Sequence, residues 1–320
     1  MAAHRPHGCG PVGPATRDAG PAHTGHPGAV QRGRLMIEVL RSGPLTTIQD
    51  LGRPGYAHLG VGRSGAVDRP SLRLANRLVG NLEDAAGLEL TFGGLALRAT
   101  ESITVALTGA PCEAMAGGRG RDLFAPLALA AGDILEIGMP SRGVRTYLAV
   151  RGGIDCEPVL GSRSTDLLSH LGPDRLRDGD ELSIGRPNGD APGVDVAPVR
   201  RLPDEPVLRV VPGPRADWFA PDALTVLGHT RYEVTSSSDR VGVRLDGPPL
   251  ERARTDELPS EGMVEGAVQV PPDGHPVIFL ADHPVTGGYP VIAVVHPEDV
   301  AAAAQLRPGQ PVRFECVRLG

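Results

Sequence analysis

The residues that could do chemistry in this chain are concentrated in four polar, glycine-containing segments. These segments cover residues 46–68, 151–166, 260–271 and 282–290. Simple turns are satisfied by Gly, Asn, Pro and Ser, so the Asp, Glu, Gln, Arg and Tyr side chains here exceed what turns require. Because loops at strand ends commonly carry function, we treat these four segments as the candidate functional regions.

The first segment places Arg53, Ser64, Gly65 and Asp68 in a single excursion that follows a predicted strand. Arginine pairs well with carboxylates and phosphates, and a helix start attracts anions. The segment therefore fits an anion- or amide-binding loop that leads into a helix. The alternative is a wide turn in which Asp68 only caps that helix, and the sequence favours neither interpretation.

The second segment contains Ser162-Arg163-Ser164-Thr165-Asp166, which puts hydrogen-bonding groups and a charge pair into one short stretch. Arg163 and Ser164 are candidate substrate-binding residues. A capped helix start before Leu167 explains the same residues and is slightly favoured.

The third and fourth segments supply Glu261 and Gln269, then Asp282 and the run Thr286-Gly287-Gly288-Tyr289. The last run follows an apolar strand, so its polar groups emerge at a strand end. The alternative for Tyr289 is a packed side chain beside a Gly-Gly turn. Our hypothesis is that Asp68 and its preceding loop meet these loops around one cleft.

The composition excludes several kinds of chemistry. All 32 basic residues are Arg and none is Lys, so the chain lacks the lysine of a Walker-type phosphate loop, of a Schiff base and of a biotin carrier. The net charge of −6 argues against a nucleic-acid partner. No apolar run approaches a membrane span, and no metal-ligand motif is present.

The pattern of short apolar runs broken by Gly and Pro predicts a mainly β protein with a few short helices. We expect strands at residues 36–40, 102–107, 146–150, 207–211, 232–235 and 277–280. A Gly-polar turn feeding an alternating strand recurs at residues 132–137, 179–184 and 309–314, which predicts more than one barrel-like unit. Helices are expected from Pro70 to Val79 and from Val300 to Leu306.

The expected domain organisation follows from composition. Residues 1–35 are rich in Gly, Pro, Ala and His and are expected to form a disordered extension. Residues 36–190 are then a first β-barrel-like domain, residues 191–206 a linker, and residues 207–320 a second β domain. The four cysteines form no C-x-x-C pair, which favours a reduced, cytoplasmic protein.

Seven blocks taken together resemble one known family. They read TTIQDLGRPGY, SGAVDRPSLRLANRLVGN, YLAVRGGID, GSRSTDLL, SDRVGVRL, SEGMVEGAVQVPPDG and TGGYPVIAVV, in unbroken order from about Met36 onward. The chain is similar to the allophanate hydrolase subunit 2 family, also called the biotin-dependent carboxyltransferase family. The resemblance implies a mainly β architecture with cyclophilin-like barrels.

The resemblance also implies a function that requires partners. It implies the C subunit of an ATP-dependent 5-oxoprolinase, which acts with a KipI-like B subunit and an A subunit to hydrolyse 5-oxo-L-proline to L-glutamate. ATP would be used by the complex, with the binding site unassigned among its members, and this chain would carry no biotin. The alternatives are a carboxyltransferase subunit of a biotin-dependent urea carboxylase or allophanate-type system, and a KipA-like protein that binds a kinase inhibitor.

The candidate site residues lie in or next to these blocks. Asp68, Glu261 and Tyr289 are the candidate catalytic residues. The candidate substrate-binding residues are Arg53, Ser64, Gly65, Asn76, Arg163, Ser164, Gln269, Asp282, Thr286, Gly287 and Gly288.

Overall fold

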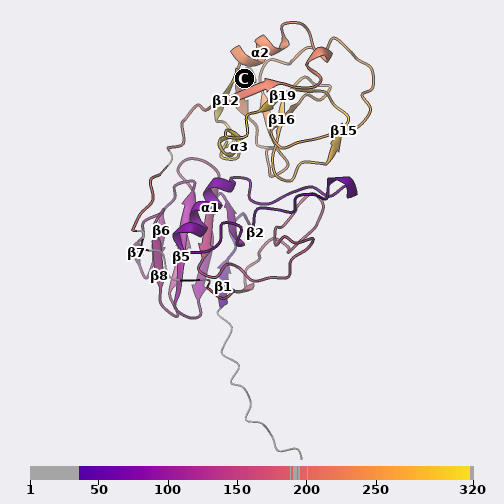
Figure 1. Ribbon diagram of the computed structural model, residues 1–320. Helices are drawn as coiled ribbons and strands as arrows, with labels where there is room; N and C mark the ends of the chain where they lie inside the picture. Colours follow the sequence, from indigo (N-terminus) through magenta and orange to yellow (C-terminus); the bar gives the residue numbers. More distant parts are fainter. Residues whose placement is uncertain (1–35, 188, 190–192, 194, 200, 318–320) are drawn as a thin grey trace, which may run out of the picture. The chain divides into compact units, whose positions relative to one another are not determined.

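The computed structural model describes residues 36–187, 189, 193, 195–199 and 201–317 (Figure 1). The extension predicted over residues 1–35 lies outside these residues, as does part of the predicted 191–206 linker. The division into domains therefore stays a prediction. No helix in the described part of the chain is long and apolar enough to cross a membrane.

The first part of the described chain forms two β-sheets. One has the strand order β11 (Glu181–Ser183), β1 (Met36–Arg41), β4 (Ala96–Ala99), β9 (Ile134–Ile137), β6 (Ala114–Ala116) and β7 (Arg119–Gly120). The other has the order β2 (Leu45–Gln49), β3 (Gly87–Thr91), β10 (Arg145–Val150), β5 (Ile103–Gly109) and β8 (Pro126–Leu129).

Aliphatic side chains from both sheets form one shared core. Ile37 and Leu97 come from the first sheet, Leu90 and Leu148 from the second, and all four are fully buried. Helix α1 (Arg69–Leu78) contacts β5 and β10 of the second sheet, where Ala75 packs with Ala149. Strand β10 is consequently buried along its whole length, and its second half, Leu148-Ala149-Val150, is a continuous apolar run.

The second part forms a closed barrel. Its strand order is β12 (Val207–Pro212), β19 (Val291–Val295), β16 (Ala267–Gln269), β17 (Val277–Phe279), β14 (Gly242–Asp246), β13 (Arg231–Val234) and β20 (Pro311–Cys316). The ring closes where β12 pairs in parallel with β20. Tyr232 and Phe314 meet edge to face in its core at 5.8 Å between centroids.

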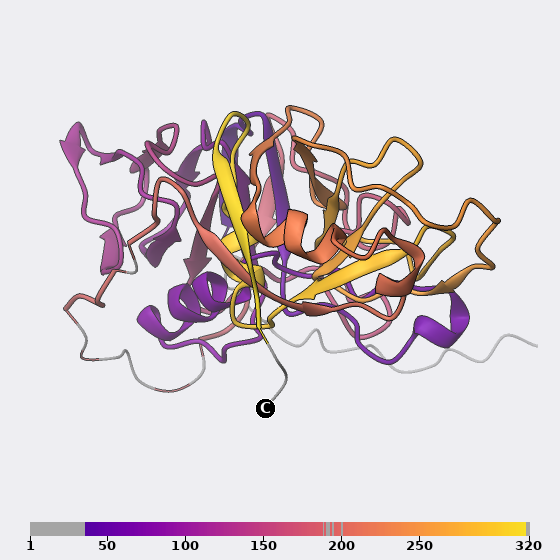
Figure 2. The same ribbon diagram turned by 90° about the horizontal axis from the view of Figure 1, so that it is seen from above.

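Several short elements accompany the barrel strands. They are α2 (Ala223–His229), α3 (Val300–Ala303), the 3-10 turn η2 (Ala216–Trp218), and a small two-stranded ribbon of β15 (Glu261–Gly262) with β18 (Thr286–Gly287). A further 3-10 turn, η1 (Ala57–Leu59), lies in the loop before α1. Figure 2 shows this loop and the β15 region on the same side of the molecule, as Figure 1 does.

The mainly β prediction is confirmed, and so are the predicted strands and the first helix. The three repeated Gly-polar hairpins do not all belong to barrels. Strands β9 and β11 lie in an open sheet, and of the three strands only β20 helps to close a barrel. Helix α3 is shorter than predicted. Asp299, at its N-terminal end, makes no side-chain capping bond and instead accepts hydrogen bonds from Arg209.

Candidate functional site

The loop after β2 is held by a buried carboxylate. Asp50 Oδ1 accepts a hydrogen bond from Ser162 Oγ at 2.6 Å and one from Ser164 Oγ, and Oδ2 accepts from the Arg163 backbone N–H at 2.6 Å. Arg53 is 1% exposed and donates to the Ser164 carbonyl. The structure thus brings the first two predicted segments together. It places Arg53 and Ser164 in the interior, where they fix the loops.

A second buried contact joins the loop before α1 to the barrel. Ser64 Oγ donates to Asp282 Oδ1 at 2.7 Å, and both side chains are almost fully buried. Gly65 adopts φ +93° and packs against the backbone of Gly52, where a Cβ would lie 2.7 Å from the Gly52 nitrogen. Only glycine fits there. Ser64, Gly65 and Asp282 are therefore buried residues that position elements of the fold.

Arg240 is the centre of this contact. Its Nε and Nη2 donate to Asp282 at 2.8 and 2.9 Å, and its Nη1 donates to Glu89. Burial alone would lower the pKa of Arg240, but Asp282 and Glu89 raise it above its usual value. The Tyr147 hydroxyl extends this network by donating a hydrogen bond to Glu89 at 2.7 Å. These residues form an ionic bridge between the sheets and the barrel.

The sequence analysis did not select Arg240, Glu89 or Tyr147. One signal was present, because Glu89 is a lone acid within the apolar strand Leu88-Glu89-Leu90. A charged residue at such a position is rarely buried unless it is paired. Its partner, Arg240, is 151 residues away in sequence, so the pairing itself could not be found without the structure.

Asp68 has the capping role that the sequence allowed. Its side chain accepts from the Ser71 backbone N–H at 3.2 Å and from Ser71 Oγ at 2.7 Å. Gln305, on the barrel side, also donates to Asp68 at 2.7 Å. Burial raises the pKa of Asp68, and these hydrogen bonds oppose the shift. Asn76 lies further along α1 and donates to the Ala85 carbonyl at 2.7 Å, which is a structural role.

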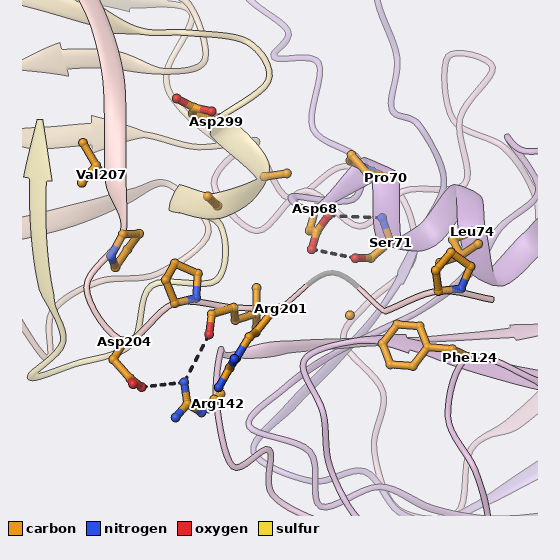
Figure 3. A pocket seen from close by; sticks show the side chains of 17 residues that line it. Asp68, Pro70, Ser71, Leu74, Phe124, Arg142, Arg201, Asp204, Val207 and Asp299 are labelled. Atoms are coloured by element: carbon orange, nitrogen blue, oxygen red, sulfur yellow. Dashed lines mark hydrogen bonds and ion pairs between the residues drawn. The ribbon is translucent and has the colours of Figure 1, made fainter. Parts of the chain in front are cut away.

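Asp68 also opens onto a pocket of about 590 Å³ (Figure 3). Leu74 and Phe124 form an apolar part of its wall. The close-up shows Arg142 paired with Asp204, at 2.7 Å, away from the Asp68 carboxylate. The lining includes none of the residues from the third and fourth predicted segments.

Those two segments meet on the outside of the barrel. Glu261 lies opposite Gly287 in the β15–β18 ribbon. Arg215 donates through Nε to both Glu261 oxygens, at 2.9 and 3.0 Å. This hydrogen-bonded pair lowers the pKa of Glu261, so the group is a carboxylate at neutral pH. Thr286 lies beside it, opposite Gly262.

Gln269 and Tyr289 complete this group. Gln269 is 6% exposed, and its Nε2 donates to the Tyr289 carbonyl at 3.1 Å. A Cβ on Gly287 would lie 2.7 Å from that Nε2, so glycine permits the close approach. Tyr289 is 44% exposed, and the Arg252 guanidinium lies 5.8 Å from the centroid of its ring. We call Arg215, Glu261, Gln269, Thr286, Gly287, Gly288 and Tyr289 the barrel-face group.

The structure therefore brings together most of the residues from the third and fourth segments, and it places Asp68 at a pocket of its own. The two regions are joined by the neighbour of Asp68, since Arg69 pairs with Glu265 at 2.6 Å. In the described part of the chain, no cluster of His, Cys, Asp and Glu is arranged to hold a metal ion.

Comparison with known proteins agrees with this architecture. Residues 59–316 match the family model described as the carboxyltransferase domain, subdomain A and B. The chain is 39% identical over 282 residues to the C subunit of 5-oxoprolinase from Escherichia coli strain K12, covering 87% of this chain and 90% of that protein. It is 34% identical to the urea amidolyase of Lachancea kluyveri, covering 87% of this chain but 17% of that protein.

A solved structure extends the similarity to the fold. The crystal structure of TTHA0988 superimposes with a TM-score of 0.82 at 37% identity, covering 90% of this chain and 57% of that chain. The sheets and the closed barrel are thus those of a carboxyltransferase-type subunit. The chain belongs to the carboxyltransferase domain family of subdomains A and B.

Proposed function

We propose that the chain is the C subunit of an ATP-dependent 5-oxoprolinase, which acts with an A subunit, and with a KipI-like B subunit, to convert 5-oxo-L-proline into L-glutamate. The similarity to a protein named as the C subunit of 5-oxoprolinase, over 90% of that protein's length, supports the proposal. The structural observation that carries it is the barrel-face group, in which the Glu261–Arg215 pair and the exposed Tyr289 ring lie on neighbouring segments.

The chemistry requires help at three atoms. A lactam carbonyl is a poor electrophile, and phosphorylation of its oxygen by ATP would make the carbon open to attack by water. The ring C–N bond then breaks and the nitrogen takes a proton, which leaves an acyl phosphate. A second water hydrolyses this acyl phosphate and releases inorganic phosphate together with the glutamate carboxylate. In this proposal the Glu261 carboxylate accepts a proton from the water, and the Tyr289 hydroxyl donates toward the ring nitrogen. Arg215 offsets negative charge as it develops.

The open position of this group explains why partners are needed. Tyr289 is 44% exposed, whereas a reactive phosphorylated intermediate must be shielded from bulk water. A partner protein docked on this face would supply the missing wall. The Gln269 amide, which holds the Tyr289 backbone, would keep the ring in place before the partner arrives.

A second candidate function has its own support. The similarity to urea amidolyase favours transfer of a carboxyl group from carboxybiotin on the same face. Biotin would have to arrive on another protein, because this chain has no lysine to carry it.

Reconstitution separates these candidates. The purified chain is mixed with the A and B subunits, ATP and 5-oxoproline, and glutamate is measured by chromatography. We expect glutamate only when all three proteins are present and none from this chain alone. Equal glutamate without this chain would contradict the proposal. Carboxyl transfer from a carboxybiotin carrier, with no glutamate from the full mixture, would establish the second function instead.

A further inference from the structure

A second pocket, of about 500 Å³, lies within the sheet region and shares no residue with the barrel-face group. The loop after β2 forms one wall, and the loops near Asn81 and Gly152 form others. Its size is within the range typical of small-molecule sites. Three arginines line it: Arg63, Arg163 and Arg186.

These arginines have few acidic partners. Arg186 makes no hydrogen bond or ion pair with any residue in the described ranges. Among the described residues, the Arg63 side chain donates a hydrogen bond only to the Leu51 carbonyl, at 3.3 Å. Arg163 donates to the Cys156 carbonyl at 2.8 Å and reaches Asp155 only at 3.7 Å. The cationic groups are therefore available for a ligand.

Two aspartates also line the pocket and offset part of the charge of the three arginines. Asp50 is 7% exposed, and its oxygens already accept hydrogen bonds from Ser162, Ser164 and two backbone N–H groups. Asp84 is exposed and forms no ion pair with any described residue. With three arginines against two aspartates, 3 − 2, the lining carries a formal charge of +1.

The backbone permits close approach at this surface. Gly161 adopts φ +78°, and a Cβ built there would meet no atom within 4 Å. The wall at Gly161 is therefore open toward solvent. Arg63 is also crowded by like charge, since partial burial and the nearby Arg69 and Arg73 lower its pKa. A bound anion would relieve that repulsion.

We propose that this pocket binds the phosphate group of a small phosphorylated molecule. A single carboxylate is saturated by one guanidinium fork, whereas a phosphate offers oxygens to two or three. Three arginines around one pocket therefore suit phosphate better. The inference goes beyond the proposed function, because it depends on none of the barrel-face residues.

Isothermal titration of the full chain at fixed ionic strength tests the assignment. The probes are ATP and inorganic phosphate, with glutamate as a carboxylate comparison. We expect saturable binding of at least one phosphate probe and weaker or no binding of glutamate. Binding of both phosphate probes assigns the site to the phosphate group itself, and binding of ATP alone assigns it to a nucleotide.

Variants locate the binding. Arg163→Ala combined with Arg186→Ala should weaken the phosphate probe at least tenfold. Arg186→Ala alone should weaken it less while leaving the melting temperature unchanged, since that side chain has no described partner. Arg119→Ala, at an exposed arginine on β7, is the matched control and should bind normally. The proposal is overturned by no saturable heat with either phosphate probe, by equal affinity in the double variant, or by tighter binding of glutamate.

Discussion

Replacing Asp282 with alanine should damage the ionic bridge between the sheets and the barrel. The Asp282 carboxylate accepts two of the four hydrogen bonds that Arg240 donates, and it also accepts one from Ser64. The Arg240 side chain is 1% exposed, so water cannot replace the lost partner in place. Breaking a buried pair in this way typically costs about 3–5 kcal/mol.

The effect can be measured by chemical and thermal unfolding. For a protein of this size, each kcal/mol shifts the melting temperature by about 2–4 °C, so we expect a drop of roughly 6–20 °C. Asp246→Ala is the matched control, because that side chain is 74% exposed and lies 3.8 Å from His275. It should change stability by less than about 0.5 kcal/mol.

A double variant tests the physical reason. The double variant Arg240→Met with Asp282→Leu removes the arginine and its principal carboxylate together. Its loss of unfolding free energy should therefore be smaller than the sum of the losses in the two single variants. Strict additivity, or a loss for Asp282→Ala no larger than that of the control, would refute the reasoning.

Three further predictions follow from other contacts. Because burial raises the pKa of Asp68, the folded state holds that proton more tightly than the unfolded state, and the contribution of Asp68 to stability falls as pH rises through the folded pKa. Asp68→Asn should therefore gain stability relative to the native chain between pH 4 and pH 8, measured by urea unfolding, and a constant difference would contradict this. Hydrogen bonds from Arg209 lower the pKa of Asp299, so that pair stabilises the fold above the unfolded pKa and is lost as pH falls. Arg209→Ala should lower the urea midpoint only slightly at pH 7, since the arginine is partly exposed. The midpoint should fall even less near pH 3, and a loss that does not change with pH would contradict the assignment. Gly287→Ala should displace the Gln269 amide and lower turnover of the reconstituted complex more than it lowers the melting temperature, and equal turnover would show that this contact is unimportant.

The sequence predicted the strands and helices better than it predicted the contacts between them. Strands such as β10 and β12 were readable because apolar runs bounded by Gly and Pro reflect local burial. Helix α1 was readable from Asp68 and Pro70, which act within one turn. Helix α2 was missed because its seven residues carry no side-chain cap and lie among the signals of a β protein.

Long-range pairing limited the prediction of the site. Polar residues at strand ends were selected correctly as unusual, but the same residue types serve in buried bridges and at open faces. Ser64 and Asp282 are 218 residues apart and form an internal contact, whereas Glu261 and Tyr289 remain near the surface. Only the fold decides which polar residue is enclosed. The expected single cleft stays a prediction: Asp68 lies at a pocket that the barrel-face group does not line, while the loop before it meets Asp282 through Ser64.

The turnover of the complex reconstituted from all three proteins, after substitution in the barrel-face group, tests the central claim most directly. Glu233→Gln, on β13 of the same barrel, is the matched control, because its exposed side chain has no described partner. We predict that Glu261→Gln and Tyr289→Phe each lower the kcat for glutamate formation at least tenfold, with complex assembly and melting temperature retained, while Glu233→Gln is unchanged. Native turnover in both barrel-face variants would contradict the account.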